Sequence, residues 1–158
     1  MQSPFVKRVI ALVAGLIVSM GLILLVERLG HSVFPPPAAL TPDATTMTDP
    51  AAQAALMKAV ADYIATAPLG ALLFPVLAWG VGAAGGAWIA ARLAPATQGL
   101  RSAAIIGAVV MLGTVMNLRS IPHPAWMWLA GPLAVLAGTW LGARLGGALG
   151  GVDRVMAA

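Results

Sequence analysis

The chain has 158 residues, of which nine are lysine or arginine and five are aspartate or glutamate, so charged residues make up only 9%. A soluble domain carries roughly 25% charged residues, whereas 60% of the residues here are hydrophobic. This composition excludes a disordered tail, and the few scattered cations form no basic patch for nucleic acid. The absence of cysteine excludes disulfides and thiolate metal sites. We therefore expect an all-α polytopic membrane protein that forms a single membrane domain over residues 1–158.

The first expected transmembrane helix covers about residues 9–26, because no charged residue lies between Arg8 and Glu27. A bilayer core needs about 20 apolar residues as helix. The run is longer than a usual signal-peptide core, and no small-x-small cleavage site follows it, so we interpret it as a retained span. The expected external loop then covers about residues 27–68. It contains Pro35–Pro37, and consecutive prolines indicate extended chain rather than helix.

The second half of this loop has the pattern of a short helix. Asp49 followed by Pro50 is typical of an N-cap with proline at the first helical position. Residues 51–65 then place apolar side chains at helical spacing, and Lys58 and Asp62 form a pair of opposite charge four residues apart. We expect an amphipathic helix that lies at the membrane surface.

Three further spans are expected in the rest of the chain, which gives four in total. The second covers about residues 69–91 and contains Pro75, which should kink the helix or leave a carbonyl without its partner. The third covers about residues 102–118. The fourth covers about residues 126–145 and contains Pro132.

The cations predict the orientation of these spans. If both termini face the cytoplasm, six cations lie inside and three outside, in agreement with the positive-inside rule. Those inside are Lys7, Arg8, Arg92, Arg101, Arg144 and Arg154; those outside are Arg28, Lys58 and Arg119.

Two segments of the chain resemble each other. Residues 88–93 and 140–145 share tryptophan, an aliphatic residue, a small residue, alanine, arginine and leucine in the same order. Two helical hairpins in a repeated arrangement would explain the match, but tryptophan and arginine also recur at membrane interfaces without common ancestry. All five tryptophans are expected near interfaces: Trp79, Trp88, Trp126, Trp128 and Trp140.

Glycines recur at four-residue spacing in the second and fourth expected spans. Such stripes let two helices approach closely. We favour contacts within the bundle over a face for a second copy, although the pattern fits both. The glycines are Gly82 and Gly86 in the second span, and Gly138, Gly142, Gly146 and Gly150 in and after the fourth.

Unusual polar residues gather at the expected external ends of the first and third spans. Anchoring in the head-group layer is the preferred interpretation. Two alternatives remain open: a site for an anion or a lipid head group that uses the arginines, and a metal or proton site that uses Glu27, His31 and His123. The cluster consists of Glu27, Arg28, His31, Asn117, Arg119 and His123.

No catalytic signature is present, and no Asp, Glu, Lys or His lies in the middle of an expected span. We therefore expect no catalytic residue, no cofactor and no nucleic-acid partner. The preferred function is non-enzymatic: a protein that packs with membrane lipid, a second copy or a membrane protein partner. A small transporter or channel is the alternative, based on the prolines within the spans and the two-hairpin pattern.

Short strings also suggest a relationship. With residues 27–31, Pro35–Pro37 and residues 121–126, the chain resembles a group of small bacterial inner-membrane proteins that have four predicted helices and a proline-rich first external loop. This resemblance implies a multi-pass protein of the bacterial plasma membrane. It implies no activity, because none is attached to that group.

Overall fold

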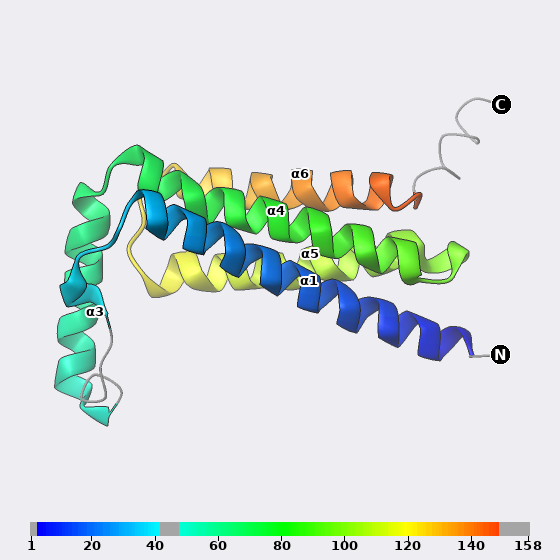
Figure 1. Ribbon diagram of the computed structural model, residues 1–158, viewed down its shortest axis with the longest axis horizontal. Coiled ribbons are helices and arrows are strands. Elements are labelled where there is room, and N and C mark those ends of the chain that lie inside the picture. Colours follow the sequence, from blue (N-terminus) through cyan, green and yellow to red (C-terminus); the bar gives the residue numbers. More distant parts are fainter. Residues whose placement is uncertain (1–2, 42–47, 149–158) are drawn as a thin grey trace.

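The computed structural model describes residues 3–41 and 48–148, and within these ranges the chain is all-α (Figure 1), which confirms the expected class. Each long helix corresponds to one of the expected segments, although α1 is longer than expected and includes the first residues assigned to the loop. Short 3₁₀ turns, η1 and η2, follow α1 and α4. The elements are α1 (Pro4–Val33), η1 (Ala38–Leu40), α3 (Pro50–Thr66), α4 (Leu69–Leu93), η2 (Ala96–Gln98), α5 (Gly99–Ser120) and α6 (Met127–Leu145).

Local sequence explains where these helices begin. Ser3 accepts a hydrogen bond from the backbone N–H of Val6 at the start of α1. The side chain of Asp49 accepts one from Ala51 N–H at 2.9 Å at the start of α3. Each cap is followed by proline at the first helical position, where the missing N–H has no partner to lose.

The four long helices α1, α4, α5 and α6 alternate in direction and form a bundle with α4 at its centre (Figure 1). Helix α4 packs against the other three, while α1 and α6 hardly touch. Helix α3 lies across one end of the bundle, which we call the α3 end, where α1 and α5 finish and α4 and α6 begin. The start of α1 and the end of α6 lie at the opposite end.

Three segments are long and apolar enough to cross a membrane: Pro4–Val33, Leu69–Leu93 and Ala96–Ser120. Within the described chain this supports three of the four expected spans. Helix α6 falls short because its 19 residues include Pro132, Arg144 and two tryptophans, which lower its mean hydropathy. The three qualifying helices suggest a membrane protein.

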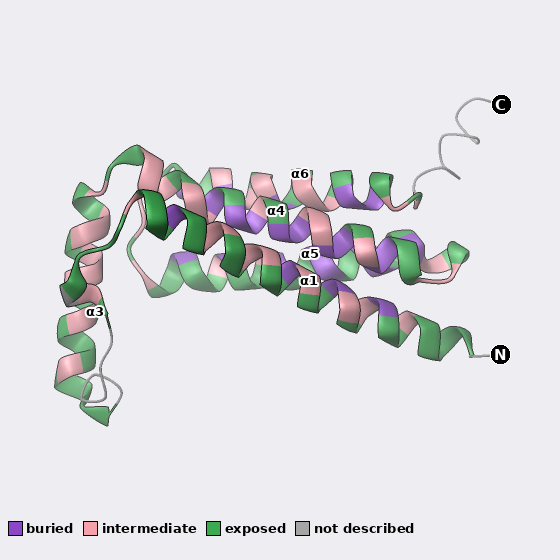
Figure 2. Cartoon of the chain, in the orientation of Figure 1, coloured by how far each residue is buried: buried purple, intermediate pink, exposed green. Residues whose placement is uncertain are grey.

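The distribution of buried and exposed residues also suggests a membrane protein (Figure 2). The buried positions are mostly alanine, glycine and a few larger side chains on the sides of the helices that meet. Large apolar side chains such as Ile17, Leu112 and Leu129 remain exposed on the outside of the bundle. A contiguous apolar surface of this extent is not stable in water. It is the pattern expected of helices surrounded by hydrocarbon.

The predicted glycine stripes lie at helix crossings. A side chain at Gly138 or Gly142 on α6 would collide with the backbone carbonyl of Gly80 or Ala84 on α4, and Gly146 faces Ala91. Gly82 and Gly86 on α4 lie equally close to α1, and a Cβ on Gly86 would lie 2.7 Å from the Gly15 carbonyl. The stripes thus let α4 approach its neighbours on two sides. Gly150 and Arg154 lie outside the described residues.

Trp79 differs from the other four tryptophans. It is buried in the interior of the bundle, where its ring lies against Gly131, whereas the others are exposed. Helix α1 packs more extensively against α4 than α5 does against α6, and the repeat of two hairpins stays a prediction. Packing as well as interfacial preference decides where a tryptophan lies. Gly131 has no side chain, and this leaves the space that the Trp79 ring occupies.

Candidate ligand pocket

A cavity of about 380 Å³ opens at the α3 end of the bundle. This volume lies within the usual range of about 300–1,000 Å³ for small-molecule sites. Every long helix and the link between α5 and α6 contribute to it. The described lining consists of Glu27, Gly30, His31, Phe34, Pro36, Tyr63, Ile64, Ala71, Leu72, Phe74, Pro75, Asn117, Ile121, His123 and Met127.

Glu27 supplies the only carboxylate of this described lining. Helix α1 continues past the expected end of the span, so Glu27 and His31 lie one turn apart on the same face, as the four-residue spacing predicts. Glu27 is half-buried, yet within the described ranges no ion pair joins it to Arg28, Arg119 or His31. A half-buried carboxylate without an ion pair is costly unless other groups compensate its charge, and His31 contributes one such electrostatic interaction.

Phe34 and Phe74 form an aromatic wall. Their ring centroids are 6.1 Å apart with an interplanar angle of 61°, an edge-to-face arrangement. Two glycines make room for the rings: a Cβ on Gly30 would lie 2.7 Å from Phe74 Cβ, and one on Gly70 would overlap the ring of Phe34. The two glycines therefore allow both rings to lie directly against a helix backbone.

Pro75 adds an acceptor to the same region. Proline has no N–H, so the carbonyl of Ala71, four residues earlier in α4, cannot receive the usual helical hydrogen bond from position 75. Both residues line the cavity. The carbonyl that Pro75 leaves without its usual partner thus belongs to a residue that lines the cavity.

His123 lies in the link between α5 and α6, with prolines on both sides. Its Nδ1 lies 2.7 Å from the carbonyl oxygen of Ile121. Since a carbonyl only accepts, Nδ1 carries the proton in this bond, which fixes the ring orientation and leaves Nε2 as the free nitrogen. His123 also borders a second hollow, between the link and α3, lined with Ala61, Ile64 and Ala65 among others.

The structure brings together four of the six polar residues that the sequence singled out. Glu27, His31, Asn117 and His123 line the cavity, while the exposed Arg28 and Arg119 do not. This arrangement removes the two positive charges on which the anion-site alternative depended. Within the described residues, Glu27 also forms no ion pair with either arginine.

The metal alternative is not supported either. Among residues 3–41 and 48–148, no three histidine, aspartate or glutamate side chains are close enough to hold one ion. Glu27 and His31 come from α1, whereas His123 comes from the link on another wall. A zinc ion needs all of its ligand atoms at about 2.0–2.2 Å, and the described residues offer no group of three such side chains.

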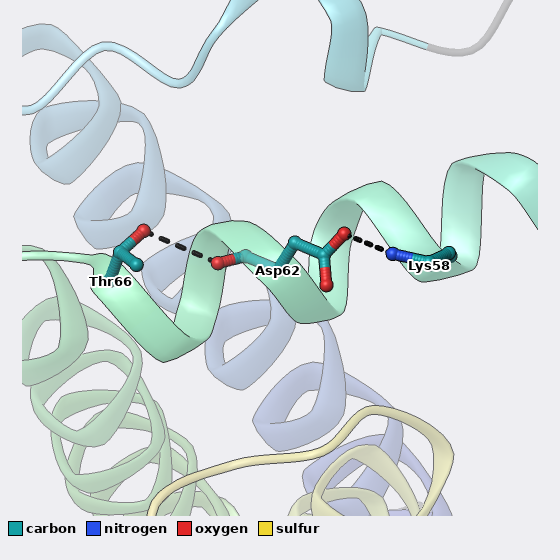
Figure 3. A network of polar contacts seen from close by, with 3 residues as sticks. All are labelled: Lys58, Asp62 and Thr66. Atoms are coloured by element: carbon teal, nitrogen blue, oxygen red, sulfur yellow. Dashed lines mark hydrogen bonds and ion pairs between the residues drawn. The ribbon is translucent and has the colours of Figure 1, made fainter.

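Helix α3 contributes residues that sequence reasoning missed. Tyr63 and Ile64 line the cavity, while the exposed side of the helix carries the predicted pair of Lys58 and Asp62, joined at 2.6 Å (Figure 3). Thr66 donates to the Asp62 carbonyl at 3.2 Å in the same row. Tyr63 is the single tyrosine of the chain. It directly follows Asp62, so its side chain leaves the helix on a different face from the charged pair, and this position was the available signal in the sequence.

No family model, curated protein sequence or solved structure matches this chain. The class of the protein therefore rests on its helices, three of which are of membrane-spanning length and hydropathy. The cavity at the α3 end is the feature from which a function is proposed.

Proposed function

We propose that the chain is a four-span protein of the bacterial inner membrane, with both termini in the cytoplasm and α3 on the external surface. Helix α6 is the additional span. Its 19 residues, at about 1.5 Å each, extend about 28 Å, close to the hydrocarbon thickness of about 30 Å. Its glycine stripe lies flush against α4, which compensates for its lower hydropathy.

The topology is testable because the chain contains no cysteine. Single cysteines at Ser3, Ala54 and Ala148 sample the start of α1, the exposed side of α3 and the end of α6. In intact cells a membrane-impermeant maleimide is expected to label Ala54→Cys alone, and all three after permeabilisation. Labelling of Ala148→Cys but not of Ser3→Cys from outside would show an odd number of spans, and labelling of both would show the reverse orientation. Either result would overturn the arrangement.

The proposed function is non-enzymatic binding of a membrane lipid or another amphipathic small molecule in the cavity at the α3 end. One observation carries it: a half-buried carboxylate without an ionic partner lines a cavity of ligand size whose other walls are largely apolar. Helix α3, with no fully buried residue, forms part of the wall. A helix of this kind lies at the head-group layer, where an amphipathic ligand would enter.

Filling the cavity tests this function. Ala71→Phe places a ring in the space, whereas Ala104→Phe places the same ring on the exposed side of α5 as a matched control. Native mass spectrometry of protein released from nanodiscs of bacterial lipid is expected to show a retained lipid or small molecule in the wild type and the control. Ala71→Phe should reduce that occupancy at least tenfold. Equal occupancy in all three proteins would contradict the proposal.

A further inference from the structure

We infer that the cavity selects a cationic group, specifically an organic ammonium ion, and that Glu27 is its counter-charge. This inference rests on the proposed function and specifies the chemistry of the ligand. The shared chemistry is an ammonium nitrogen attached to an apolar or amphipathic body, whether it belongs to a lipid head group or to a free amine.

Charge is the first argument. Among the described residues that line the cavity there is one carboxylate and neither lysine nor arginine. No described cation pairs with that carboxylate. Burial of an unpaired charge is unfavourable, and an ammonium ion in the cavity would relieve it. An anionic ligand would instead meet the Glu27 carboxylate in a wall whose described lining contains neither lysine nor arginine.

The aromatic lining is the second argument. Phe34, Phe74 and Tyr63 come from three different elements and surround the same space. Aromatic faces carry negative electrostatic potential and attract cations, most strongly where water is excluded. A carboxylate combined with several aromatic rings is the arrangement that holds ammonium groups, including quaternary ones that have no N–H to donate.

The remaining polar groups are mainly acceptors. The Ala71 carbonyl lacks its helical partner because of Pro75. The Nδ1–H of His123 donates to the Ile121 carbonyl, so that Nε2 is the nitrogen left to accept whenever the ring carries one proton. Asn117 can accept through its side-chain oxygen. A primary ammonium group has three N–H donors, and this lining offers acceptors for them.

The test compares probes of matched shape on the full chain in phosphatidylglycerol nanodiscs. Benzyltrimethylammonium is the cation, neopentylbenzene is its neutral isostere and phenylacetate is the anion. After subtraction of the same titrations into empty nanodiscs, which removes attraction of the cation to the anionic lipid, calorimetry is expected to give at least tenfold tighter binding of the cation than of either other probe, equivalent to about 1.4 kcal/mol. This comparison uses the wild type, so it does not depend on the folding of any variant.

Variants then locate the counter-charge. Glu27→Gln keeps the size of the side chain and removes the charge, and it should abolish the preference for the cation. Arg28→Gln changes the charge of the adjacent exposed residue, which does not line the cavity, and should leave the preference intact. Selectivity that persists in Glu27→Gln would overturn the assignment of Glu27.

The outcomes separate the two proposals. If all three probes bind equally well, the cavity is a ligand site but not one for ammonium, so the inference fails and the proposed function stands. If no probe binds and no lipid is retained, both fail. A nanodisc that contains phosphatidylethanolamine distinguishes the sources: competition with the soluble cation identifies a lipid head group, and unchanged affinity identifies a free amine. Either of these two results supports ammonium recognition.

Discussion

Replacement of Gly142 by valine is expected to separate α6 from α4 and to lower the free energy of unfolding by about 3 kcal/mol. A Cβ at this position would overlap the carbonyl oxygen of Ala84 and lie 2.9 Å from both Ala87 Cβ and Trp88 N. Backbone atoms cannot rotate away as a flexible side chain can, so the whole helix has to move. Titration with sodium dodecyl sulfate in mixed micelles measures the change.

The matched control is Gly113→Val. Gly113 lies on the exposed side of α5, and a methyl group at this position would have no atom of another helix within 4 Å. Glycine and valine differ by only about 0.5 kcal/mol in helix propensity, so the control should unfold almost as the wild type does. Similar losses in both variants would show that valine itself, rather than the crossing of α4 and α6, causes the effect.

Ile106→Ala is expected to have the next largest effect, about 2 kcal/mol of lost stability. The side chain of Ile106 is fully buried and lies against Gly15 of α1 and Gly86 of α4, so it fills the space where three helices meet. In a membrane the separated helices contact acyl chains, which removes the gain from water transfer. The cost that remains comes from the cavity left behind.

Ile105→Ala is the control for this cavity, because it removes the same atoms from the preceding residue of α5. Ile105 is 37% exposed on the outside of the bundle, where an acyl chain can occupy the vacated space. We expect less than about 0.5 kcal/mol of change for this variant. Equal losses at positions 105 and 106 would contradict the assignment of Ile106 to the three-helix contact.

The apolar runs and capping residues predicted that these helices exist but not all of their bounds, since α1 continues to Val33. The N-cap at Asp49 and the proline that follows it predict the start of α3 correctly, because these interactions are local. The glycine spacing predicts which face of α4 and of α6 can lie directly against a neighbouring helix. It does not predict the partner, since a stripe of small residues suits any apposed helix, and only the fold shows that Gly142 meets Ala84.

The candidate pocket was predicted in part. Glu27 and His31 share a face because of their spacing, and the convergence with Asn117 and His123 follows from the antiparallel order of the helices, which brings the ends of α1 and α5 to the same end of the bundle. The sequence could not exclude Arg28 and Arg119, since it does not show which faces of α1 and α5 border the cavity. It also could not reveal Tyr63 or the pairing of Phe34 with Phe74, because these depend on how α3 and α4 are placed.

The modest hydropathy of α6 has a consequence for how the protein is made. This helix contains a proline, an arginine and several glycines, and it is flush with α4 along one side. In the four-span arrangement, its entry into the bilayer depends on a docking partner that the ribosome has already produced. Insertion of α6 would then be a cooperative step, in which this helix leaves the translocation machinery only when it packs against α4.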